Sequence, residues 1–453
     1  MRVLFLTPEC APYTKTGGLG DVSGALPAAL RAIGIDVKVM LPGYREVLQA
    51  LPFTKKSSLD VLGLRCRLLE SPEFIVLDCP ELYVRDGGPY QDASGADWGD
   101  NALRFAALCK AAASLPADVV HCNDWPAGLA PLYGAKPSLL TVHNLAFQGN
   151  FDPAVLRRLG LPADAFSIER AEFYGKLSFL KAGLTCANAI TTVSPTYARE
   201  IQTEAFGCGM DGILRARSGV LSGILNGIDT RVWDPAADTH IAARYDTASL
   251  ERKSINKQEL QRRMDLAADP RVPLLGMVGR MTEQKGVDLV SAAVDELVAL
   301  PAQLAILGTG QREHELALAA AAARHPGRVA VRIGFNEELA HLVEAGADVF
   351  LMPSRFEPCG LNQMYSQRYG TPPVARATGG LADTVSDGET GFLFRTDLVE
   401  AVRRAAAAYR DPARWREIQR AGMRRDFSWG AAARRYADLY GRLATRAPAA
   451  LRT

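Results

Sequence analysis

Two loops of nearly the same sequence carry residues suited to binding an anion. TGGLGDVS occupies residues 16–23, with Gly17 and Gly18, and TGGLADTVS occupies residues 378–386, with Gly379 and Gly380. In each loop the paired glycines precede an expected helix, where backbone without a Cβ can approach a ligand and free N–H groups carry partial positive charge. Lys15 directly precedes the first loop and adds a full charge. One such loop alone does not distinguish a phosphate site from a simple turn.

Two further cations, Arg280 and Lys285, lie in GRMTEQKG, directly after a strand predicted at residues 274–278. No lysine follows Lys285 in the chain. Open α/β sheets bind ligands at the carboxyl ends of their strands, so this pair favours a phosphate-bearing ligand. Neither glycine loop matches GxGxxG with a later acidic residue, or GxxxxGK followed by Ser or Thr. This disfavours a nicotinamide cofactor and a P-loop triphosphate.

Polar residues also follow two predicted strands of the N-terminal half, in HCNDW and in TVHNLAFQG. Their imidazole, amide and carboxylate groups are those that a hydroxyl-rich ligand requires. His121 and Trp125 could equally be core residues, since residue type alone does not decide. His143 is better placed for a site, because Asn144 and a glycine-bearing loop follow it.

One acidic residue of the C-terminal half, Glu357 in PSRFEPCGLNQ, has a distinctive setting. It should occupy a strand-to-helix turn before a helix at about residues 361–369, and its aromatic, proline and glycine neighbours favour a fixed carboxylate that accepts ligand hydroxyls. A bland surface glutamate is the alternative. Cys359 is better explained as a packed thiol than as a nucleophile, since no histidine lies near it in sequence.

Two sets of alternating strands and helices must position these residues. Short apolar runs begin near residues 3, 37, 74, 119, 139 and 189, and the pattern restarts near residues 274, 304, 329, 349 and 373. Such alternation predicts two α/β domains, each with a parallel sheet. We place them at residues 1–232 and 233–430, with a hinge at 229–238. A final amphipathic helix within 431–453 needs an apolar partner, which either domain could supply.

The composition excludes several classes of protein. A net charge of +2 supplies no broad basic field for nucleic acid or anionic lipid. No apolar stretch is long enough for a membrane span, and the eight cysteines form no CxxC pair, so we expect a soluble protein in a reducing cytoplasm. The six histidines show no HExxH or HxH spacing, so we expect no metal site.

Eight motifs, in order along nearly the whole chain, resemble those of the bacterial glycogen synthase family. They are KTGGLGDV, HCNDW, TVHNLAFQG, VSPTYAREI, LNGID, GRMTEQKG, PSRFEPCGLNQ and TGGLADTV. The resemblance implies the GT-B fold, an α/β architecture of two Rossmann-like domains facing across a deep cleft. It also implies transfer of glucose from ADP-glucose to the non-reducing end of an α-1,4-glucan, with retention of configuration and without a cofactor.

The family's roles are then expected at the matching residues. Lys15, Arg280 and Lys285 would hold the diphosphate, Glu357 would bind glucose hydroxyls, and His143 would line the reacting carbon. The remaining substrate-binding residues implied by the resemblance are Gly17, Gly18, Asp21, Asp124, Asn144, Asn226, Cys359, Gly360, Leu361, Thr378, Gly379 and Gly380. The chain departs from related transferases at Tyr365, where many have a second glutamate, and at Asn123, where many have histidine.

Three other interpretations stay open. The first is a GT-B transferase that uses UDP-glucose or makes a small glucoside or a maltosyl phosphate. A phosphorylase is disfavoured, since Lys285 is the only late lysine that could hold pyridoxal phosphate. A glucan-binding protein built on an inactive transferase is disfavoured by the presence of Lys15, Arg280, Lys285 and Glu357. The oligomeric state, the acceptor chain length and any regulation do not follow from the sequence.

Overall fold

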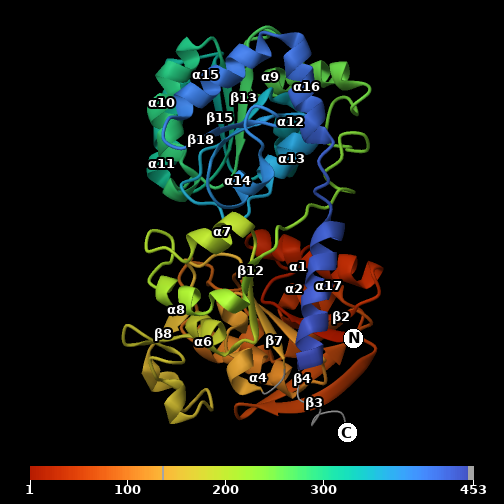
Figure 1. Cartoon of the computed structure of the whole chain (residues 1–453), viewed down its shortest axis with the longest axis vertical. Helices are drawn as coiled ribbons and strands as arrows, with labels where there is room; N and C mark the ends of the chain where they lie inside the picture. The colour runs from red at the N-terminus through yellow and green to blue at the C-terminus, as the bar shows by residue number, and fades with distance from the viewer. Residues whose placement is uncertain (135–136, 447–453) are drawn as a thin grey trace. The chain divides into compact units, whose positions relative to one another are not determined.

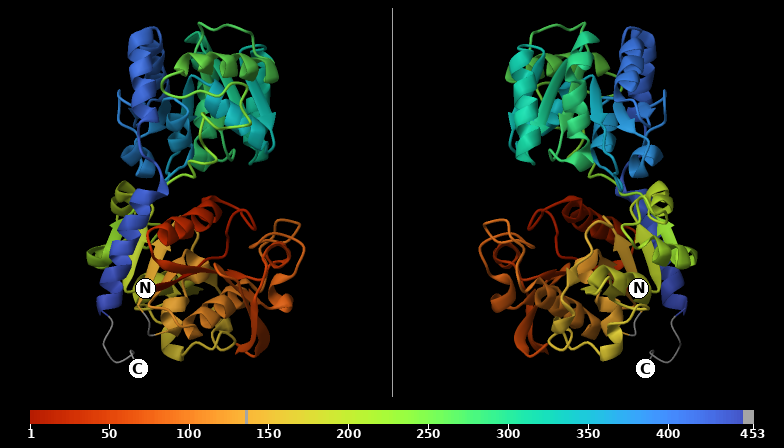
Figure 2. Two further views of the ribbon diagram at one scale, coloured as in Figure 1. Left: turned by 90° about the vertical axis from the view of Figure 1, so that its right-hand side faces the viewer. Right: turned by 90° about the vertical axis from the view of Figure 1, so that its left-hand side faces the viewer.

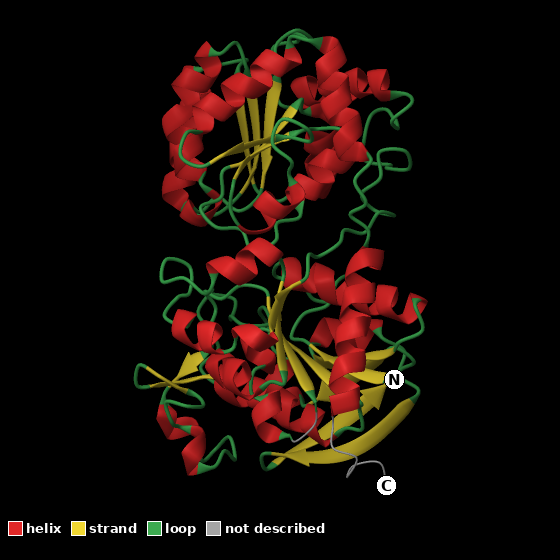
Figure 3. Cartoon of the chain, viewed as in Figure 1, coloured by secondary structure: helices red, strands yellow, loops and turns green. Residues whose placement is uncertain are grey.

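The computed structural model describes residues 1–134 and 137–446, and within them the chain divides into two compact units (Figure 1). The first unit comprises Met1–Gly227 together with the final helix, and the second comprises Ile228–Ser428. Each unit contains a sheet with helices on both of its faces (Figure 3). The predicted α/β class with two Rossmann-like domains is therefore confirmed.

The first unit is built on one mixed sheet, nine-stranded in the described residues, with the order β12-β11-β7-β6-β1-β2-β5-β4-β3. Its strands are β1 (Arg2–Leu6), β2 (Asp36–Pro42), β3 (Lys55–Val61), β4 (Leu64–Glu70), β5 (Phe74–Asp78), β6 (Val119–Asn123), β7 (Ser138–Val142), β11 (Ala189–Thr192) and β12 (Leu221–Gly223). All pairs are parallel except β3·β4 and β4·β5. A small antiparallel sheet joins β8 (Asn150–Phe151), β10 (Lys176–Ser178) and β9 (Glu172–Phe173).

The helices of the first unit include one from the far end of the chain. They are α1 (Gly18–Ala32), α2 (Arg45–Ala50), α3 (Pro80–Tyr83), α4 (Asn101–Ser114), α5 (Ala130–Tyr133), α6 (Phe179–Cys186), α7 (Pro195–Glu200), α8 (Asp211–Ala216) and α17 (Trp429–Arg446). Helix α17 lies beside α1 (Figures 1 and 2). The sequence left its partner open, and the structure assigns it to the first unit; residues 447–453 of the predicted C-terminal segment lie outside the described residues.

Helix α17 is held by a buried polar network as well as by apolar packing. His121 is fully buried on β6, and its two ring nitrogens lie 2.7 Å from the Tyr440 hydroxyl and 2.6 Å from the Thr141 hydroxyl. Burial lowers the pKa of His121 well below its usual value, so the imidazole is neutral. Of the two roles that the sequence allowed for His121, the internal one is correct.

The second unit has a parallel sheet with six strands in the described residues and the order β15-β14-β13-β16-β17-β18. Its strands are β13 (Leu274–Val278), β14 (Gln303–Gly308), β15 (Val329–Ile333), β16 (Val349–Met352), β17 (Pro373–Arg376) and β18 (Phe392–Phe394). Its helices are α9 (Lys253–Arg263), α10 (Val287–Ala299), α11 (Arg312–Arg324), α12 (Glu337–Gly346), α13 (Asn362–Arg368), α14 (Gly379–Thr384), α15 (Leu398–Tyr409) and α16 (Pro412–Met423). The five apolar runs named from the sequence form β13 to β17.

The segment predicted as a hinge, residues 229–238, belongs to the second unit, because the chain divides at Gly227 and not at residue 232. The indole of Trp233 stacks between the rings of His341 and Tyr365, with centroid distances of 3.9 Å to each. Next to the division, the Ile228 N–H donates to the Phe427 carbonyl at 2.8 Å, so the two crossing segments run side by side. Tyr365, at the position where related transferases carry a second glutamate, therefore anchors this connecting segment.

No helix among the described residues is both long enough and apolar enough to span a bilayer.

Candidate functional site

The two central strands of the second unit bring a lysine and a glutamate together from distant parts of the chain. The order of the strands along the chain reverses between β13 and β16, which makes this the point where open α/β sheets bind ligands. Lys285 ends a short 3₁₀ turn after β13, and Glu357 lies in the turn after β16. Lys285 Nζ and Glu357 Oε2 are 2.6 Å apart although 72 positions separate the residues.

This ion pair leaves binding capacity for a ligand. Glu357 Oε2 also accepts a hydrogen bond from the Ser354 hydroxyl at 2.9 Å, whereas no group in the described residues donates to Oε1. The Lys285 ammonium has three N–H donors and gives one to Glu357. The side chains are 23% exposed for Lys285 and 8% for Glu357, so a ligand would meet them in a largely desolvated place.

A second ion pair fixes the loops that carry Lys285 and Glu357. The Arg355 guanidinium donates to both carboxylate oxygens of Asp288, at 2.7 and 2.6 Å, and the Arg355 N–H donates to the Gln284 carbonyl at 2.8 Å. These hydrogen bonds hold the pKa of Asp288 below its usual value. Both loops are thereby tied together directly beside the Lys285–Glu357 pair.

The glycine loop of the second unit packs against the Glu357 turn. A Cβ on Gly379 would lie 2.0 Å from the Glu357 carbonyl oxygen, and a Cβ on Gly380 would lie 2.1 Å from that of Cys359. The Gly380 N–H donates to the Glu357 carbonyl at 3.1 Å. These glycines are therefore required because two backbone segments meet here, and their contact positions Glu357.

Three of the other predicted residues of this unit lie in the Glu357 turn, Thr378 adjoins the glycine loop, and Arg280 lies after β13. Cys359 is buried, Gly360 has a φ of +71°, Leu361 precedes α13 and Thr378 precedes α14. Arg280 is exposed, and within residues 1–134 and 137–446 it forms no ion pair with a carboxylate. Its guanidinium is thus available to an anion from outside.

The glycine loop of the first unit differs from its counterpart in what surrounds it. Nothing in the described structure lies within 4 Å of a Cβ built on Gly17 or Gly18, and no side chain caps helix α1. The Lys15 side chain packs over Gly20, because a Cβ on that glycine would lie 2.9 Å from Lys15 Cγ. Lys15 Nζ lies 2.7 Å from Asp21 Oδ1. The two similar sequences therefore have different surroundings: the first has open space beside Gly17 and Gly18, and the second packs on its own unit.

A buried carboxylate that the sequence reasoning missed holds the first loop in place. Glu9 accepts hydrogen bonds from the N–H groups of Thr16 and Gly17, at 2.5 and 3.1 Å, and from the Tyr90 hydroxyl at 2.6 Å. Glu9 is 4% exposed. The available signal was an acidic residue at the carboxyl end of the first strand, where the strand order of this sheet reverses between β1 and β6.

At the ends of β6 and β7, His143 is held by two neighbours. The Asp124 carboxylate accepts from the His143 N–H at 2.6 Å, and Asn123 Oδ1 lies 3.0 Å from His143 Nε2. Because Asn123 donates its amide N–H to the Leu6 carbonyl at 3.0 Å, its Oδ1 is the acceptor and His143 carries its proton on Nε2. The departure at Asn123 thus leaves a residue that orients His143.

Burial determines the protonation states of His143 and Asp124. It lowers the pKa of His143 to about 3, so the imidazole is neutral and its Nδ1 lone pair is free of a proton. It raises the pKa of Asp124 to about 7, against the opposing effect of the His143 and Asn144 backbone N–H groups. Asp124 adopts a positive φ of 54°, a strained conformation that often marks functional positions.

Within residues 1–134 and 137–446, the side chains of Asn144 and Asn226, the last two predicted residues, form no hydrogen bond with the side chains described above. The Asn144 side chain accepts from the Ala146 N–H at 3.1 Å in a local turn. Asn226 is 9% exposed, and its Oδ1 has no hydrogen-bond partner in the described part of the chain. Within the same residues, no three His, Cys, Asp or Glu side chains are grouped so that they could hold a metal ion.

Comparisons with protein families divide the chain much as the structure does. Residues 2–216 match the starch synthase catalytic domain, and residues 256–421 match glycosyl transferases group 1. The chain is 55% identical to a glycogen synthase of Aromatoleum aromaticum, covering 99% of this chain and 98% of that protein. It is 50% identical to glycogen synthase 1 of Methylococcus capsulatus, covering 97% and 96%.

The chain is also similar to solved structures of sugar-transferring enzymes. The catalytic domain of starch synthase IV from Arabidopsis thaliana, bound to ADP and acarbose, superposes with a TM-score of 0.86 at 31% identity, over 98% of this chain and 99% of that one. Sucrose-phosphate synthase from Thermosynechococcus elongatus shares the fold at 20% identity, with a TM-score of 0.62 and 98% coverage of both chains.

Proposed function

Because the chain belongs to the glycogen synthase family and has its GT-B fold, we propose that it elongates an α-1,4-glucan from ADP-glucose at the non-reducing end, with retention of configuration. The ADP in the starch synthase IV structure supports an adenine nucleotide as the leaving group. Acarbose, an oligosaccharide in the same structure, supports a glucan as the acceptor.

The observation that carries this proposal is the Lys285–Glu357 pair at the reversal of strand order. Lys285 offers two unused N–H donors and Arg280 an unpaired guanidinium, which suit the oxygens of a diphosphate. Glu357 Oε1 is an unused acceptor on the carboxylate that Lys285 contacts, which suits a sugar hydroxyl. A sugar joined to a diphosphate presents these two kinds of group side by side.

The first unit supplies groups of matching chemistry. The Gly17 N–H is already donated to Glu9, so the groups that suit the negative charge of a phosphate are the Gly18 backbone, at the N-terminus of α1 with open space beside it, and the half-exposed Lys15. His143 is neutral, so it offers a lone pair and a backbone carbonyl, not a positive charge, to a sugar ring. Asn123 holds that imidazole through its Nε2, and Asp124 holds the His143 backbone N–H.

A front-face displacement fits these groups. The bond between the glucose anomeric carbon and the β-phosphate oxygen breaks, and a bond to the acceptor 4-hydroxyl oxygen forms on the same face. The hydroxyl proton passes to the departing phosphate oxygen, and ADP leaves. Lys15, Arg280 and Lys285 would stabilise the charge that develops on the diphosphate, which is the largest electrostatic demand of the step.

Donor competition tests the proposal directly. The full chain would be incubated with maltotriose and radiolabelled ADP-glucose or UDP-glucose, and the products separated by length. We expect maltotetraose and longer glucans from ADP-glucose, with α-anomeric signals in the proton NMR spectrum of the product. Preferential use of UDP-glucose would refute the donor assignment, and a β-anomeric product would refute retention.

A further inference from the structure

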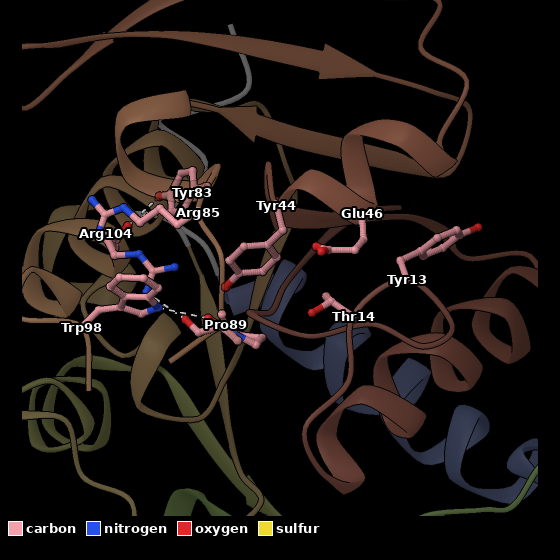
Figure 4. A pocket seen from close by; sticks show the side chains of 11 residues that line it. Tyr13, Thr14, Tyr44, Glu46, Tyr83, Arg85, Pro89, Trp98 and Arg104 are labelled. Carbon is pink, nitrogen blue, oxygen red and sulfur yellow. Dashed lines mark hydrogen bonds between the residues drawn. The ribbon is translucent and has the colours of Figure 1, made fainter. Parts of the chain in front are cut away.

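A polar cavity of about 190 Å³ in the first unit contains none of the residues assigned above (Figure 4). It is formed by the loop after β1, helices α2, α3 and α4, and residues 85–98. Thr14, next to Lys15, forms part of its wall. Figure 4 shows Tyr44 between Arg104 and Trp98 on one side and Glu46 and Thr14 on the other.

The Tyr44 hydroxyl has no hydrogen-bond partner within the described residues, although the side chain is 5% exposed. Burial raises its pKa, so the phenol stays protonated and remains a donor. Buried hydroxyls in folded proteins are nearly always hydrogen-bonded, because an unpaired one is costly. An unpaired hydroxyl in a cavity wall is therefore itself an indication of a ligand.

Arg104 provides a second unused donor. It is 1% exposed, donates from Nε to the Leu82 carbonyl at 2.9 Å, and donates from Nη1 to Asn101 Oδ1 at 2.6 Å. No carboxylate of the described residues forms an ion pair with it, and its Nη2 makes no hydrogen bond there. A buried guanidinium ordinarily has all of its faces paired.

The charges around the cavity nevertheless balance. Arg85 is neutralised by Asp100 through two hydrogen bonds of 2.7 and 2.5 Å. Glu46 lies on the cavity wall without an ion-pair partner in the described chain, so the wall carries one unpaired negative side chain as well as the positive Arg104. The cavity thus suits a neutral ligand that both donates and accepts hydrogen bonds, and it disfavours a phosphate or a carboxylate.

The volume of the cavity and its aromatic lining indicate what kind of neutral ligand it could hold. At about 30 Å³ for each molecule of liquid water, the cavity would hold roughly six waters, which is room for one sugar ring. The ring of Trp98 is fixed by a hydrogen bond from its N–H to the Gly88 carbonyl at 3.1 Å and offers an apolar face. A hexose ring combines hydroxyls around its edge with apolar C–H faces, so it matches both features.

We propose that this cavity is a subsite for one glucosyl unit of an α-1,4-glucan, bound by the Tyr44 hydroxyl, Arg104 and Glu46 and separate from the reacting residues. The identity of the sugar rests on the proposed function. Because Thr14 adjoins Lys15, a chain held here is kept next to the loop that we assign to phosphate. The subsite then contributes to the affinity for the acceptor and not to the chemical step.

The test is calorimetric titration of maltotriose into the full chain with no nucleotide sugar present. Tyr44→Phe removes only a hydroxyl that bonds to nothing in the described protein, so its Tm should stay unchanged or rise. We expect maltotriose binding to weaken about five- to ten-fold in Tyr44→Phe, the loss of one hydrogen bond, and likewise in Glu46→Gln. Tyr174→Phe, whose ring is 82% exposed elsewhere on this unit, is the matched control and should bind as the wild type.

Because the titration needs no donor, its result is independent of whether the chain transfers glucose. In the transfer assay, Tyr44→Phe should raise the KM for maltotriose by the same factor and leave kcat unchanged. Equal affinity in wild type, Tyr44→Phe and Glu46→Gln would overturn the proposal, as would the absence of maltotriose binding by the wild type. Competition between inorganic phosphate and maltotriose would also overturn it, since that would identify an anion site.

Discussion

Replacing Glu357 by glutamine tests the central assignment, because it keeps the shape of the side chain and removes its charge. Glu357 Oε2 receives hydrogen bonds from Lys285 Nζ and the Ser354 hydroxyl, at 2.6 and 2.9 Å. A hydrogen bond between charged groups contributes about 1.5–3 kcal/mol. Lys285 is 23% exposed and can turn toward water, so we expect the free energy of unfolding to fall by about 1–2 kcal/mol.

The effect on turnover should be much larger than the effect on stability. If Oε1 accepts a glucose hydroxyl whose bond strengthens as positive charge develops at the anomeric carbon, Glu357→Gln should lower kcat about 10²–10³-fold. Initial rates with labelled ADP-glucose and maltotriose measure this, and calorimetry with ADP should show binding within about three-fold of the wild type. Lys285→Met, in contrast, should act mainly on ADP binding and weaken it at least ten-fold.

A matched control separates loss of chemistry from loss of folding. Asp348 and Lys257 form a buried pair in the same unit, with Oδ2 and Nζ 2.7 Å apart, and neither belongs to the proposed site. Asp348→Asn should lower the unfolding free energy more than Glu357→Gln does, yet keep kcat per folded molecule. A Glu357→Gln enzyme with wild-type kcat, or with ADP binding reduced in proportion to kcat, would refute the role given to this carboxylate.

Three further predictions follow from particular contacts. Gly379→Ala should unfold the second unit at lower temperature than the wild type, because its Cβ would lie 2.0 Å from a carbonyl oxygen, whereas Gly17→Ala should keep its Tm and weaken ADP-glucose binding. Burial raises the pKa of Asp124 to about 7 from 3.8, so its ionisation should cost stability as pH rises from about 4 to 7, by about 1.4 kcal/mol per unit, and urea unfolding of Asp124→Asn should lack this loss. Burial lowers the pKa of Lys253 to about 7 from 10.5, so the wild type should gain stability between pH 7 and 10 relative to Lys253→Met; a constant difference across that range would contradict a buried neutral amine.

Local pattern was enough to identify most of the sheet. Continuous apolar runs such as Leu274–Val278 and Val349–Met352 form buried parallel strands, because a strand covered on both faces is mostly apolar. The β3–β4 hairpin was missed, since Lys55–Val61 is an exposed, polar edge strand that shows no such run. Its turn, with Leu62 and Gly63 both at positive φ, gave only the weak signal of a single glycine.

The sequence by itself determined which residue types stand at strand ends and which family the chain belongs to, and it predicted a phosphate- and sugar-binding chemistry. Tertiary structure alone decided how these residues combine. Lys285 contacts Glu357 across 72 positions, and Gly379 packs against backbone whereas Gly17 has open space beside it. Glu9 is buried with hydrogen-bond partners, and the Tyr44 hydroxyl is buried without one in the described residues. The physical reason is that burial, hydrogen-bond pairing and the space around a Cβ depend on segments remote in the chain. A pattern of neighbouring residues cannot contain that information.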